Sequence, residues 1–445
     1  MKEAVSYGLR LREKRYRNAL LSRPCIYGVF SGPLGGFHPI KEKCTGCMRC
    51  VQEYPAVCSV DRNPDFYECA DSYWASEGDA TTSGSPVATA SYEAETGKIP
   101  IKGMGYKGPF VGPGWDSIWT DMSEIVRPTR DGVYGREFIS TVVDVGSKRG
   151  SLRFDERSTA KFSEVVEAPL PIIFEYLPPN LNSPSILESV AGASVQTDTF
   201  FIASPTQASQ LPEEQRHHLI PLVSANNLHT IGLIRGAQLI ELEDYTSFFK
   251  EDQRERWKID RNKVISVRLP LTQKAAEIAV DLALDGADVI HLTADYHGEG
   301  WDKEKPKFVR DLIREVHGKL VSESCRDDVT LIASGGITRA EHVPKAIICG
   351  ADLVAIDTTV LVALQSRFEG EYASPESGRI APEKFDSNWG EQRLVNLLAS
   401  WHDQLIEILS AMGIRDVRRL RGDVGRAMFN EDLEKEAFRD ITRRD

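Results

Sequence analysis

Long unbroken apolar runs are missing from this 445-residue sequence. A helix that crosses a bilayer needs about 20 consecutive apolar residues, and no segment comes near that length. The opening residues, MKEAVSYGLRLREKRYRNALL, also lack the apolar core and small-residue cleavage site of a secretory signal. We therefore expect a cytoplasmic protein with no membrane span.

An excess of positive charge is missing as well. The chain has 54 Lys and Arg residues against 66 Asp and Glu residues, which gives a net charge of −12. Such a chain repels phosphates unless its positive charge is concentrated on one face, so we expect no nucleic-acid partner. The composition, 41% apolar and 27% charged, is typical of a globular enzyme. The length allows several domains or one large barrel with appendages.

Cysteine is scarce beyond residue 70, where only Cys325 and Cys349 occur, and we expect both to be buried structural thiols. The other six cysteines precede that point: Cys25, Cys44, Cys47, Cys50, Cys58 and Cys69. A disulfide framework is not expected without export. Zinc sites usually pair two separated Cys-x-x-Cys knuckles, whereas Cys-x-x-Cys-x-x-Cys wraps one loop around three corners of an iron–sulfur cube. The spacing of Cys44, Cys47 and Cys50 therefore predicts one [4Fe–4S] cluster, with zinc or unligated thiols as alternatives.

The fourth cluster ligand is predicted to be Cys58. In the bacterial ferredoxin run the fourth cysteine follows after three further residues, and here the next cysteine lies farther along the chain. Cys69 and Cys25 are the alternatives. Metal ligation can supply folding free energy to a segment with little apolar periodicity, so we interpret residues 1–150 as an iron–sulfur segment that leads into the next domain.

Short apolar runs alternating with amphipathic helices characterise the chain from about residue 170. Eight such runs are expected to be buried strands: 169–177, 197–204, 218–224, 237–243, 263–271, 287–293, 328–335 and 351–357. Gly286 and Gly318 follow helical patterns and suit the left-handed position that ends a helix. Eight strands joined by helical crossovers most economically close into a (β/α)8 barrel, which we place at residues 151–385. The alternative is a doubly wound sheet, which would need a Gly-rich loop after its first strand, where the sequence is EYLPPNLNSP.

The residues after the barrel carry one apolar stripe at helical spacing, from Leu394 to Met412, and Gly413 follows it. We expect residues 386–445 to form a helical extension that packs on the barrel. A helix that binds a partner is the alternative.

The carboxyl ends of barrel strands carry the active sites of such folds, and phosphate commonly binds near the last two loops. The segment IASGGITRAEHVPKAIICGADLVAIDTT lies there. Gly335 and Gly336 would let backbone N–H groups approach an anion, and Thr338 and Glu341 have the spacing of a capping box at a helix N-terminus. The alternative is a plain glycine turn between strand and helix.

The strand order, the motif SGGITRAEHVPKAIICGADLVAIDT and the tail LSAMGIRDVRRLRG resemble the FMN-binding synthase domain of glutamate synthase and its stand-alone relatives. Several of those relatives carry ferredoxin-like cysteines. The resemblance implies FMN across the barrel mouth, with Arg268 in place of a strand-five lysine that faces the flavin. A pairing of Arg268 with Glu241 or Glu243 is the alternative. The residues implied at the FMN phosphate are Gly335, Gly336, Thr338, Asp357 and Thr358.

The resemblance also implies a function. The chain would be an oxidoreductase subunit in which the [4Fe–4S] cluster passes electrons to FMN and the flavin reduces an imine such as 2-iminoglutarate, with Arg268 as a catalytic residue. His291 and Asp295 are further catalytic candidates by their own chemistry, because an imidazole and a nearby carboxylate can relay a proton. Solvated loop polarity is the alternative for both. No nucleophilic Cys follows Met1, so glutamine hydrolysis would need a glutaminase-like subunit. Other redox subunits, ferredoxin among them, would supply electrons. The alternative is a divergent barrel that serves as an electron-transfer or scaffold subunit of a redox complex.

Overall fold

The structure of this protein is a computed structural model that describes part of the chain. The described residues are 28–31, 86–98, 114–120, 138–147, 153–154, 160–161, 165–178, 181, 183–224, 237–247, 263–302, 304, 306–369, 379–381 and 385–429. The six cysteines before residue 70 lie outside these ranges, so the predicted [4Fe–4S] cluster and its ligands Cys44, Cys47, Cys50 and Cys58 stay predictions.

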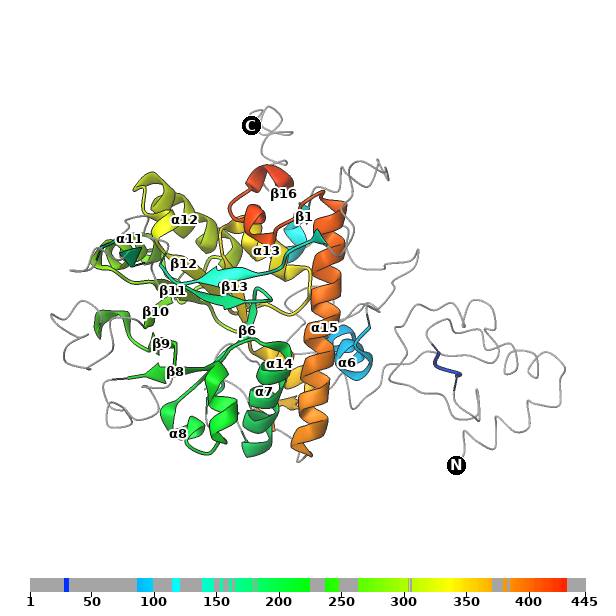
Figure 1. The fold of residues 1–445 in the computed structure, drawn as a ribbon. Helices are drawn as coiled ribbons and strands as arrows, with labels where there is room; N and C mark the ends of the chain where they lie inside the picture. Colours follow the sequence, from blue (N-terminus) through cyan, green and yellow to red (C-terminus); the bar gives the residue numbers. More distant parts are fainter. Residues whose placement is uncertain are drawn as a thin grey trace, which may run out of the picture.

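Eight strands close into a barrel in the order β10-β11-β12-β13-β6-β7-β8-β9 (Figure 1). Each strand runs parallel to both neighbours. The strands are β6 (Ile172–Phe174), β7 (Phe201–Ala203), β8 (Leu219–Val223), β9 (Leu239–Leu242), β10 (Val264–Pro270), β11 (Val289–Thr293), β12 (Thr330–Ser334) and β13 (Leu353–Ile356). All eight predicted strands are therefore confirmed, and the (β/α)8 barrel with them.

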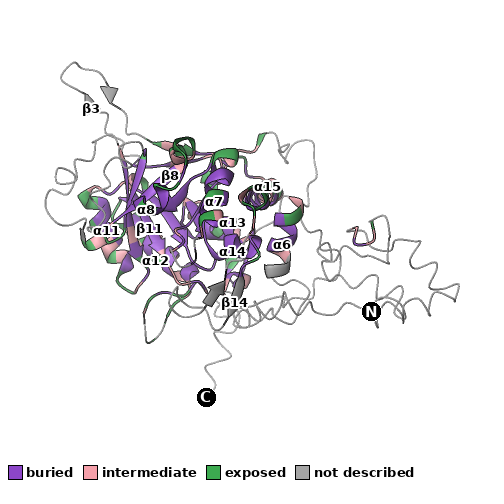
Figure 2. Cartoon of the chain, turned by 90° about the horizontal axis from the view of Figure 1, so that it is seen from below, coloured by how far each residue is buried: buried purple, intermediate pink, exposed green. Residues whose placement is uncertain are grey.

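The strands are buried along nearly their whole length, as in β8 and β12. Parallel strands are covered by helices on one face and by the barrel interior on the other, which is why they read as continuous apolar runs. Figure 2 shows buried residues on the strands and exposed residues on the outer surface of helices such as α11. Phe174 and Phe201 are among the largest fully buried side chains.

Helices cover the outside of the barrel. They are α7 (Pro184–Thr197), α8 (Pro205–Ala208), α11 (Ala275–Asp285), α12 (Val309–Ser322), α13 (His342–Cys349) and α14 (Thr358–Ala363). Gly286 ends α11 with φ 102°, as predicted. The same prediction for Gly318 is wrong, because α12 continues through it to Ser322. Val316 and Leu320 are both buried, so the apolar face extends past the glycine and holds the next turn in the helix.

The long helix α15 (Ser387–Ala411) lies along α7 and α6 (Pro86–Thr96) (Figure 1). Leu397, Trp401 and Leu405 of its apolar stripe are buried. The Trp401 Nε1–H donates to Glu93 Oε2 of α6 at 2.8 Å, and Gly413 follows the helix with φ 69°. The stripe therefore packs within the chain, although the boundaries predicted for the three domains stay predictions.

Short elements flank the barrel. Four two-stranded sheets pair β1 (Ile118–Thr120) with β16 (Ala427–Phe429), β2 (Val143–Val145) with β5 (Val166–Ala168), β3 (Arg153–Phe154) with β4 (Ala160–Lys161), and β14 (Arg367–Glu369) with β15 (Arg379–Ala381). The 3-10 helices are η4 (Gly114–Ser117), η7 (Glu213–His218), η9 (Tyr245–Ser247), η10 (Arg326–Asp328), η11 (Val417–Leu420) and η12 (Val424–Arg426).

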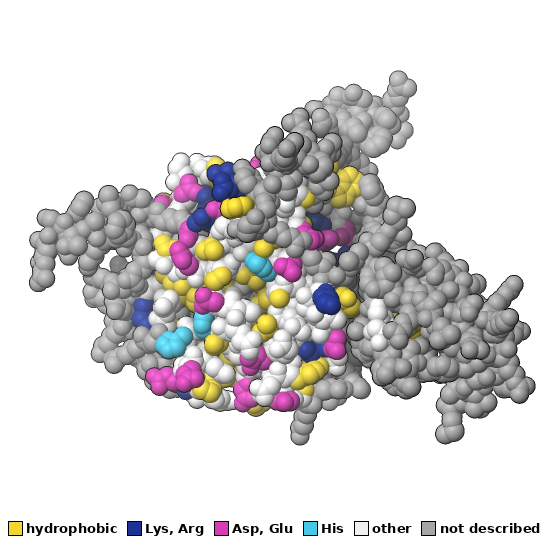
Figure 3. All heavy atoms as spheres, turned by 45° about the vertical axis from the view of Figure 1, so that its right-hand side comes forward, with side chains coloured by type: hydrophobic (Ala, Val, Ile, Leu, Met, Phe, Trp, Pro, Cys, Tyr) yellow, Lys and Arg dark blue, Asp and Glu magenta, His cyan; other side chains and the backbone are white. Residues whose placement is uncertain are grey.

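Charged side chains of both signs are interspersed over the described part of the face shown in Figure 3. None of the helices described is both long and apolar enough to cross a membrane.

Candidate functional site

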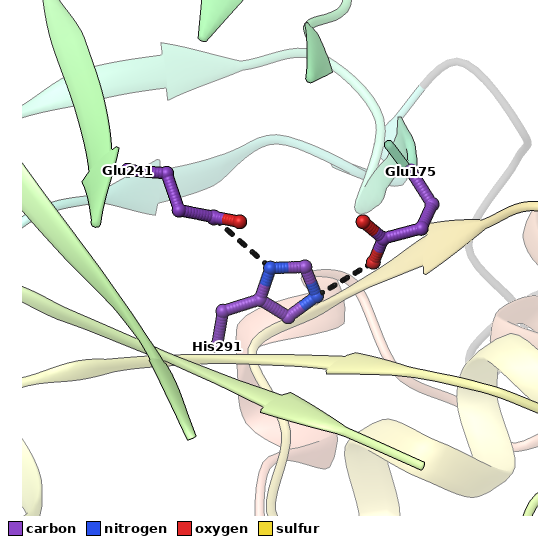
Figure 4. Close-up of side chains that lie close together, drawn as sticks. All are labelled: Glu175, Glu241 and His291. Atoms are coloured by element: carbon purple, nitrogen blue, oxygen red, sulfur yellow. Dashed lines mark hydrogen bonds and ion pairs between the residues drawn. The ribbon is translucent and has the colours of Figure 1, made fainter. Parts of the chain in front are cut away.

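Four charged residues from four strands meet inside the barrel. Glu175 directly follows β6, Glu241 lies on β9, Arg268 on β10 and His291 on β11. Each is a charged residue within an otherwise largely apolar strand sequence. Figure 4 shows Glu175 and Glu241 pointing at the imidazole of His291 from two sides.

These four side chains form a closed circuit, which we call the ion-pair ring. The Arg268 Nε–H donates to Glu241 Oε1 at 2.5 Å, and Arg268 Nη2–H donates to Glu175 Oε1. His291 Nδ1 lies 3.0 Å from Glu241 Oε2, and His291 Nε2 lies 3.0 Å from Glu175 Oε2. Each carboxylate therefore bridges the arginine and the histidine through separate oxygens.

The ion-pair ring crosses the bore of the barrel. In the closed sheet β6 lies four strands from β10 in either direction, so Glu175 and Arg268 come from opposite walls. Ser266 Oγ also donates to Glu241 Oε2 at 3.1 Å, and the Tyr176 N–H donates to Glu175 Oε1 at 2.6 Å. The ring thus makes a polar floor beneath the barrel mouth.

The ring is buried and its charges balance. Glu241 and His291 have no exposed surface. Burial alone would lower the pKa of His291, but the Glu241 and Glu175 carboxylates outweigh it and raise the pKa to about 9. Burial would raise the pKa of each carboxyl, but the two cations hold both pKa values below the usual range. The distances agree with an imidazolium, because each ring nitrogen lies 3.0 Å from a carboxylate oxygen, with hydrogen-bond geometry at Nδ1 and an ion-pair contact at Nε2. Two anions and two cations sum to zero.

The ring is also the one cluster in the described residues with metal-ligand chemistry, since Glu175, Glu241 and His291 bring three donor atoms within 4.8 Å of one another. Each carboxylate already contacts a nitrogen of His291, at 3.0 Å in both cases. Arg268 already provides the second cation. We therefore interpret the cluster as a self-neutralised network.

Arg268 is the most exposed member of the ring. The alternative that paired it with Glu241 is confirmed, and Glu243 is exposed. The arginine side chain retains 17% exposure, and its Cζ lies 5.9 Å from the centre of the Tyr176 ring. Its amino group Nη1 has no hydrogen-bond partner among the described residues.

The loop after β12 carries the two predicted anion-binding glycines, both with left-handed φ values. Gly335 has φ 95° and Gly336 has φ 68°. A Cβ at Gly335 would lie 2.5 Å from the backbone oxygen of Asp295, and one at Gly336 would lie 2.7 Å from Gly298 Cα. The close approach of the loop after β11 therefore requires both glycines, whether or not an anion binds.

The capping box predicted for Thr338 and Glu341 is wrong. Helix α13 begins at His342, and Glu341 pairs with Lys345 Nζ at 3.2 Å instead of reaching back along the chain. The Thr338 N–H donates to His342 Nδ1 at 3.1 Å, so a ring nitrogen satisfies an amide in this turn. The Thr338 hydroxyl is buried and has no partner among the described residues.

Trp115, a residue that the sequence did not single out, contacts this loop and the helix that follows it. Its Nε1–H donates to Gly336 O at 3.0 Å, its ring stacks on His342, and its carbonyl accepts from Lys345 Nζ at 2.9 Å. Trp115 and Gly336 are 221 residues apart, so no local signal could have joined them.

Asp357 and Asp295 lie near the mouth but outside the ring. Asp357 is buried and accepts from the Thr358 N–H at the start of α14, and burial raises its pKa to about 6. Asp295 Oδ1 accepts from the N–H groups of His297 and Glu299 in its own loop, and burial raises its pKa to about 6 as well. The expected proton relay between Asp295 and His291 is not assembled here, because both nitrogens of the buried His291 face the ring.

The loop after β12 contains a hydrogen-bond donor that fits a phosphate group. The unpartnered Thr338 hydroxyl is a buried donor that a phosphate oxygen would satisfy. Asp357 opposes a phosphate when it is ionised, and its raised pKa reduces that repulsion in mildly acid solution.

The sequence of this barrel is similar to sequences of known proteins. Residues 253–371 match the family model described as the conserved region in glutamate synthase. Over 93% of the chain and 92% of the relative, the sequence is 23% identical to the archaeal glutamate synthase [NADPH] of Archaeoglobus fulgidus. The chain is therefore similar to archaeal-type glutamate synthases over most of its length, at low identity.

Other matches differ in extent. The archaeal glutamate synthase [NADPH] of Methanocaldococcus jannaschii is 33% identical, over 38% of this chain and 34% of that protein. Among solved structures, variants of a mandelate oxidase and of flavocytochrome b2 each give a TM-score of 0.46 at 14% identity. The matches cover 75% and 71% of this chain, and 91% and 76% of the two solved chains.

Sequence reasoning found Arg268 and His291 as site residues, and it named Glu241 only as a pairing partner. It missed Glu175. The signal was present, because the PLPIIFEYL strand contains a single charged residue at its end, as the other three strands of the ring contain theirs. A charge within a buried strand of a barrel has to meet an opposite charge inside it.

Proposed function

We propose that this chain is an FMN-dependent oxidoreductase of the glutamate synthase type. The observation that carries the proposal is Arg268, whose Nη1 has no hydrogen-bond partner among the described residues, inside a barrel whose sequence is similar to that family. A fixed guanidinium beside a flavin favours its reduced, anionic form.

The residues proposed to hold the cofactor divide into two groups. Gly335, Gly336, Thr338 and Thr358 would hold the phosphate, with Asp357 beside them, and Arg268 would face the flavin ring. FMN accepts electrons singly and delivers them as a hydride. Trp115 supports the phosphate group indirectly, since it fixes the carbonyl of Gly336 and stacks on His342.

The substrate proposed is an imine of a 2-oxoacid, such as 2-iminoglutarate. The imine carbon takes up a hydride and the nitrogen a proton. Asp295 and Asp357 are the candidate proton donors in the described part of the mouth, because burial leaves the pKa of each at about 6. His291 has no exposed surface, so we assign it to the support of Arg268 rather than to contact with the substrate.

The electrons are proposed to come from a [4Fe–4S] cluster on Cys44, Cys47, Cys50 and Cys58, loaded by ferredoxin or another redox subunit. Glutaminase-like subunits would supply ammonia. The spacing of the first three cysteines supports this proposal.

Cofactor content tests the proposal directly. The full chain purified without oxygen should carry FMN bands and a broad iron–sulfur absorption, and should form glutamate from 2-oxoglutarate and ammonia when reduced. Cys47→Ala should remove the iron–sulfur absorption, whereas Cys325→Ala, at a buried thiol of the barrel, should keep it. A folded protein that remains colourless after reconstitution with iron, sulfide and FMN would refute the assignment.

A second candidate is a divergent scaffold or electron-transfer subunit of a redox complex. One observation favours it: Asp357 already takes the Thr358 N–H that a phosphate would otherwise use. A chain that contains iron, binds no flavin and co-purifies with other redox subunits would support this second function.

A further inference from the structure

We propose that Glu175, Glu241 and His291 are positioning residues for Arg268, and that the closed ion-pair ring aims the Arg268 Nη1 group at an electron-rich oxygen of a ligand in the barrel mouth. The inference deepens the proposed function and rests on it for the identity of the occupant. The oxygen belongs either to a flavin ring carbonyl or to the carboxylate of a 2-oxoacid.

The first step in the argument is how the guanidinium is held. Nε and Nη2 occupy one edge of the group, and each donates to a different carboxylate. A single carboxylate would leave the arginine free to rotate about its long side chain. Two carboxylates from β9 and from the end of β6 fix both the position and the plane of the guanidinium.

The second step concerns the direction in which Nη1 points. Glu241 pairs in register with Ser266, which lies two residues before Arg268 on β10 and therefore farther from the mouth. The Nε–H thus donates to a residue below the level of Arg268, while Nη2 on the same edge reaches Glu175 beyond the end of β6. Nη1 lies outside this edge and makes none of the contacts of the ring, and the side chain as a whole keeps 17% exposure.

The third step explains why the histidine belongs to the ring. Two buried carboxylates around one arginine would leave a net negative charge inside the barrel, which is strongly unfavourable. His291 contacts the oxygens that Arg268 leaves unused and adds the second positive charge. It therefore allows both carboxylates to stay ionised and to hold the arginine.

A double-mutant cycle tests this positioning role in the full chain. Glu175→Gln should raise the dissociation constant of FMN, or of 2-oxoglutarate if the carboxylate is the occupant, by about tenfold, since one charge-assisted hydrogen bond to Arg268 is lost. Arg268→Gln should weaken binding at least as much. Glu175→Gln should then add nothing in the Arg268→Gln background, because Glu175 acts through the arginine.

Ser266→Ala is the matched control. It also removes a donor to Glu241, at 3.1 Å, but it leaves all four ion pairs of the ring closed, so ligand affinity should stay within about twofold of the wild type. Additive effects of Glu175→Gln and Arg268→Gln, or a Ser266→Ala variant as weak as Glu175→Gln, would overturn the positioning role while leaving the proposed function intact.

A measurement without ligand tests the ion-pair ring separately from the proposed function. The imidazole nitrogens of His291, followed by nuclear magnetic resonance, should show a cation through neutral pH in the wild type and a neutral ring in Glu175→Gln. A charged His291 in that variant would contradict the ring. A wild-type chain that binds neither FMN nor 2-oxoglutarate would refute the aim of Arg268 together with the proposed function, whatever the state of the ring.

Discussion

Arg268 on β10 and Glu175 at the end of β6 form an ion pair across the bore of the barrel, from strands on opposite walls. Barrels of this class usually fill their interior with layers of branched apolar side chains. Here a ring of four charges replaces part of one layer. Removal of any one member leaves an unbalanced buried charge. The free energy of unfolding should therefore depend on the charge of each ring residue.

Loss of the arginine should be costly. We expect Arg268→Gln to lower the free energy of unfolding by about 3–5 kcal/mol, because Glu175 and Glu241 then share a single buried cation. Arg418→Gln is the control, since Arg418 pairs with Asp416 and Asp144 at 45% exposure and should cost about 1 kcal/mol or less. Denaturant unfolding measures both. Equal losses in the two variants would contradict a buried, coupled ring.

Stability should fall in alkaline solution because of His291. Its pKa is about 9 in the folded chain and ordinary, near 6.5, in the unfolded chain, so the folded state binds the extra proton between these values. The contribution is complete below pH 6.5 and is lost as the pH rises through 9. We expect the loss to be roughly 3 kcal/mol.

The measurement compares unfolding free energies at pH 6.5 and pH 9.5 for the wild type and for His291→Gln. Other groups titrate over this range in both proteins, so the difference between the two slopes isolates the histidine. Parallel slopes would show that His291 is not an imidazolium in the folded chain.

The glycines of the loop after β12 should tolerate no side chain. Gly336→Ala places a Cβ 2.7 Å from Gly298 Cα at a left-handed φ, so we expect a loss of about 1–3 kcal/mol and weaker FMN binding. Gly318→Ala is the contrasting variant, because Gly318 lies within α12 with no atom within 4 Å of the added Cβ. It should gain about 0.5–1 kcal/mol. Thermal unfolding distinguishes the two, and a tolerated Gly336→Ala would show that the two loops do not meet as described.

The Thr338 hydroxyl should matter to a ligand more than to the fold. Thr338→Val removes a buried hydroxyl that has no partner among the described residues, so we expect stability without ligand to stay equal or to rise slightly. FMN affinity should fall about tenfold if the hydroxyl donates to the phosphate. Riboflavin, which has no phosphate, is the control ligand and should bind both proteins alike. Unchanged FMN affinity would remove Thr338 from the phosphate site.

The sequence determined the barrel and all eight of its strands, because a strand buried on both faces has a short apolar sequence and a crossover helix has an amphipathic one. It also supplied the motif around Gly335 and Gly336, and the pairing partner Glu241 for Arg268. These are properties of single segments or of neighbouring strands, which lie close together for simple geometric reasons.

Tertiary structure alone decided the rest. Closure of the sheet brought Glu175 to Arg268 from the opposite wall, and a residue 221 positions away, Trp115, came to hold the carbonyl of Gly336. The protonation of His291 also depends on two carboxylates that are distant in the chain. Charges interact through space, at distances set by the closed fold, so the sequence marks a charge in a buried strand but does not show which partner it meets.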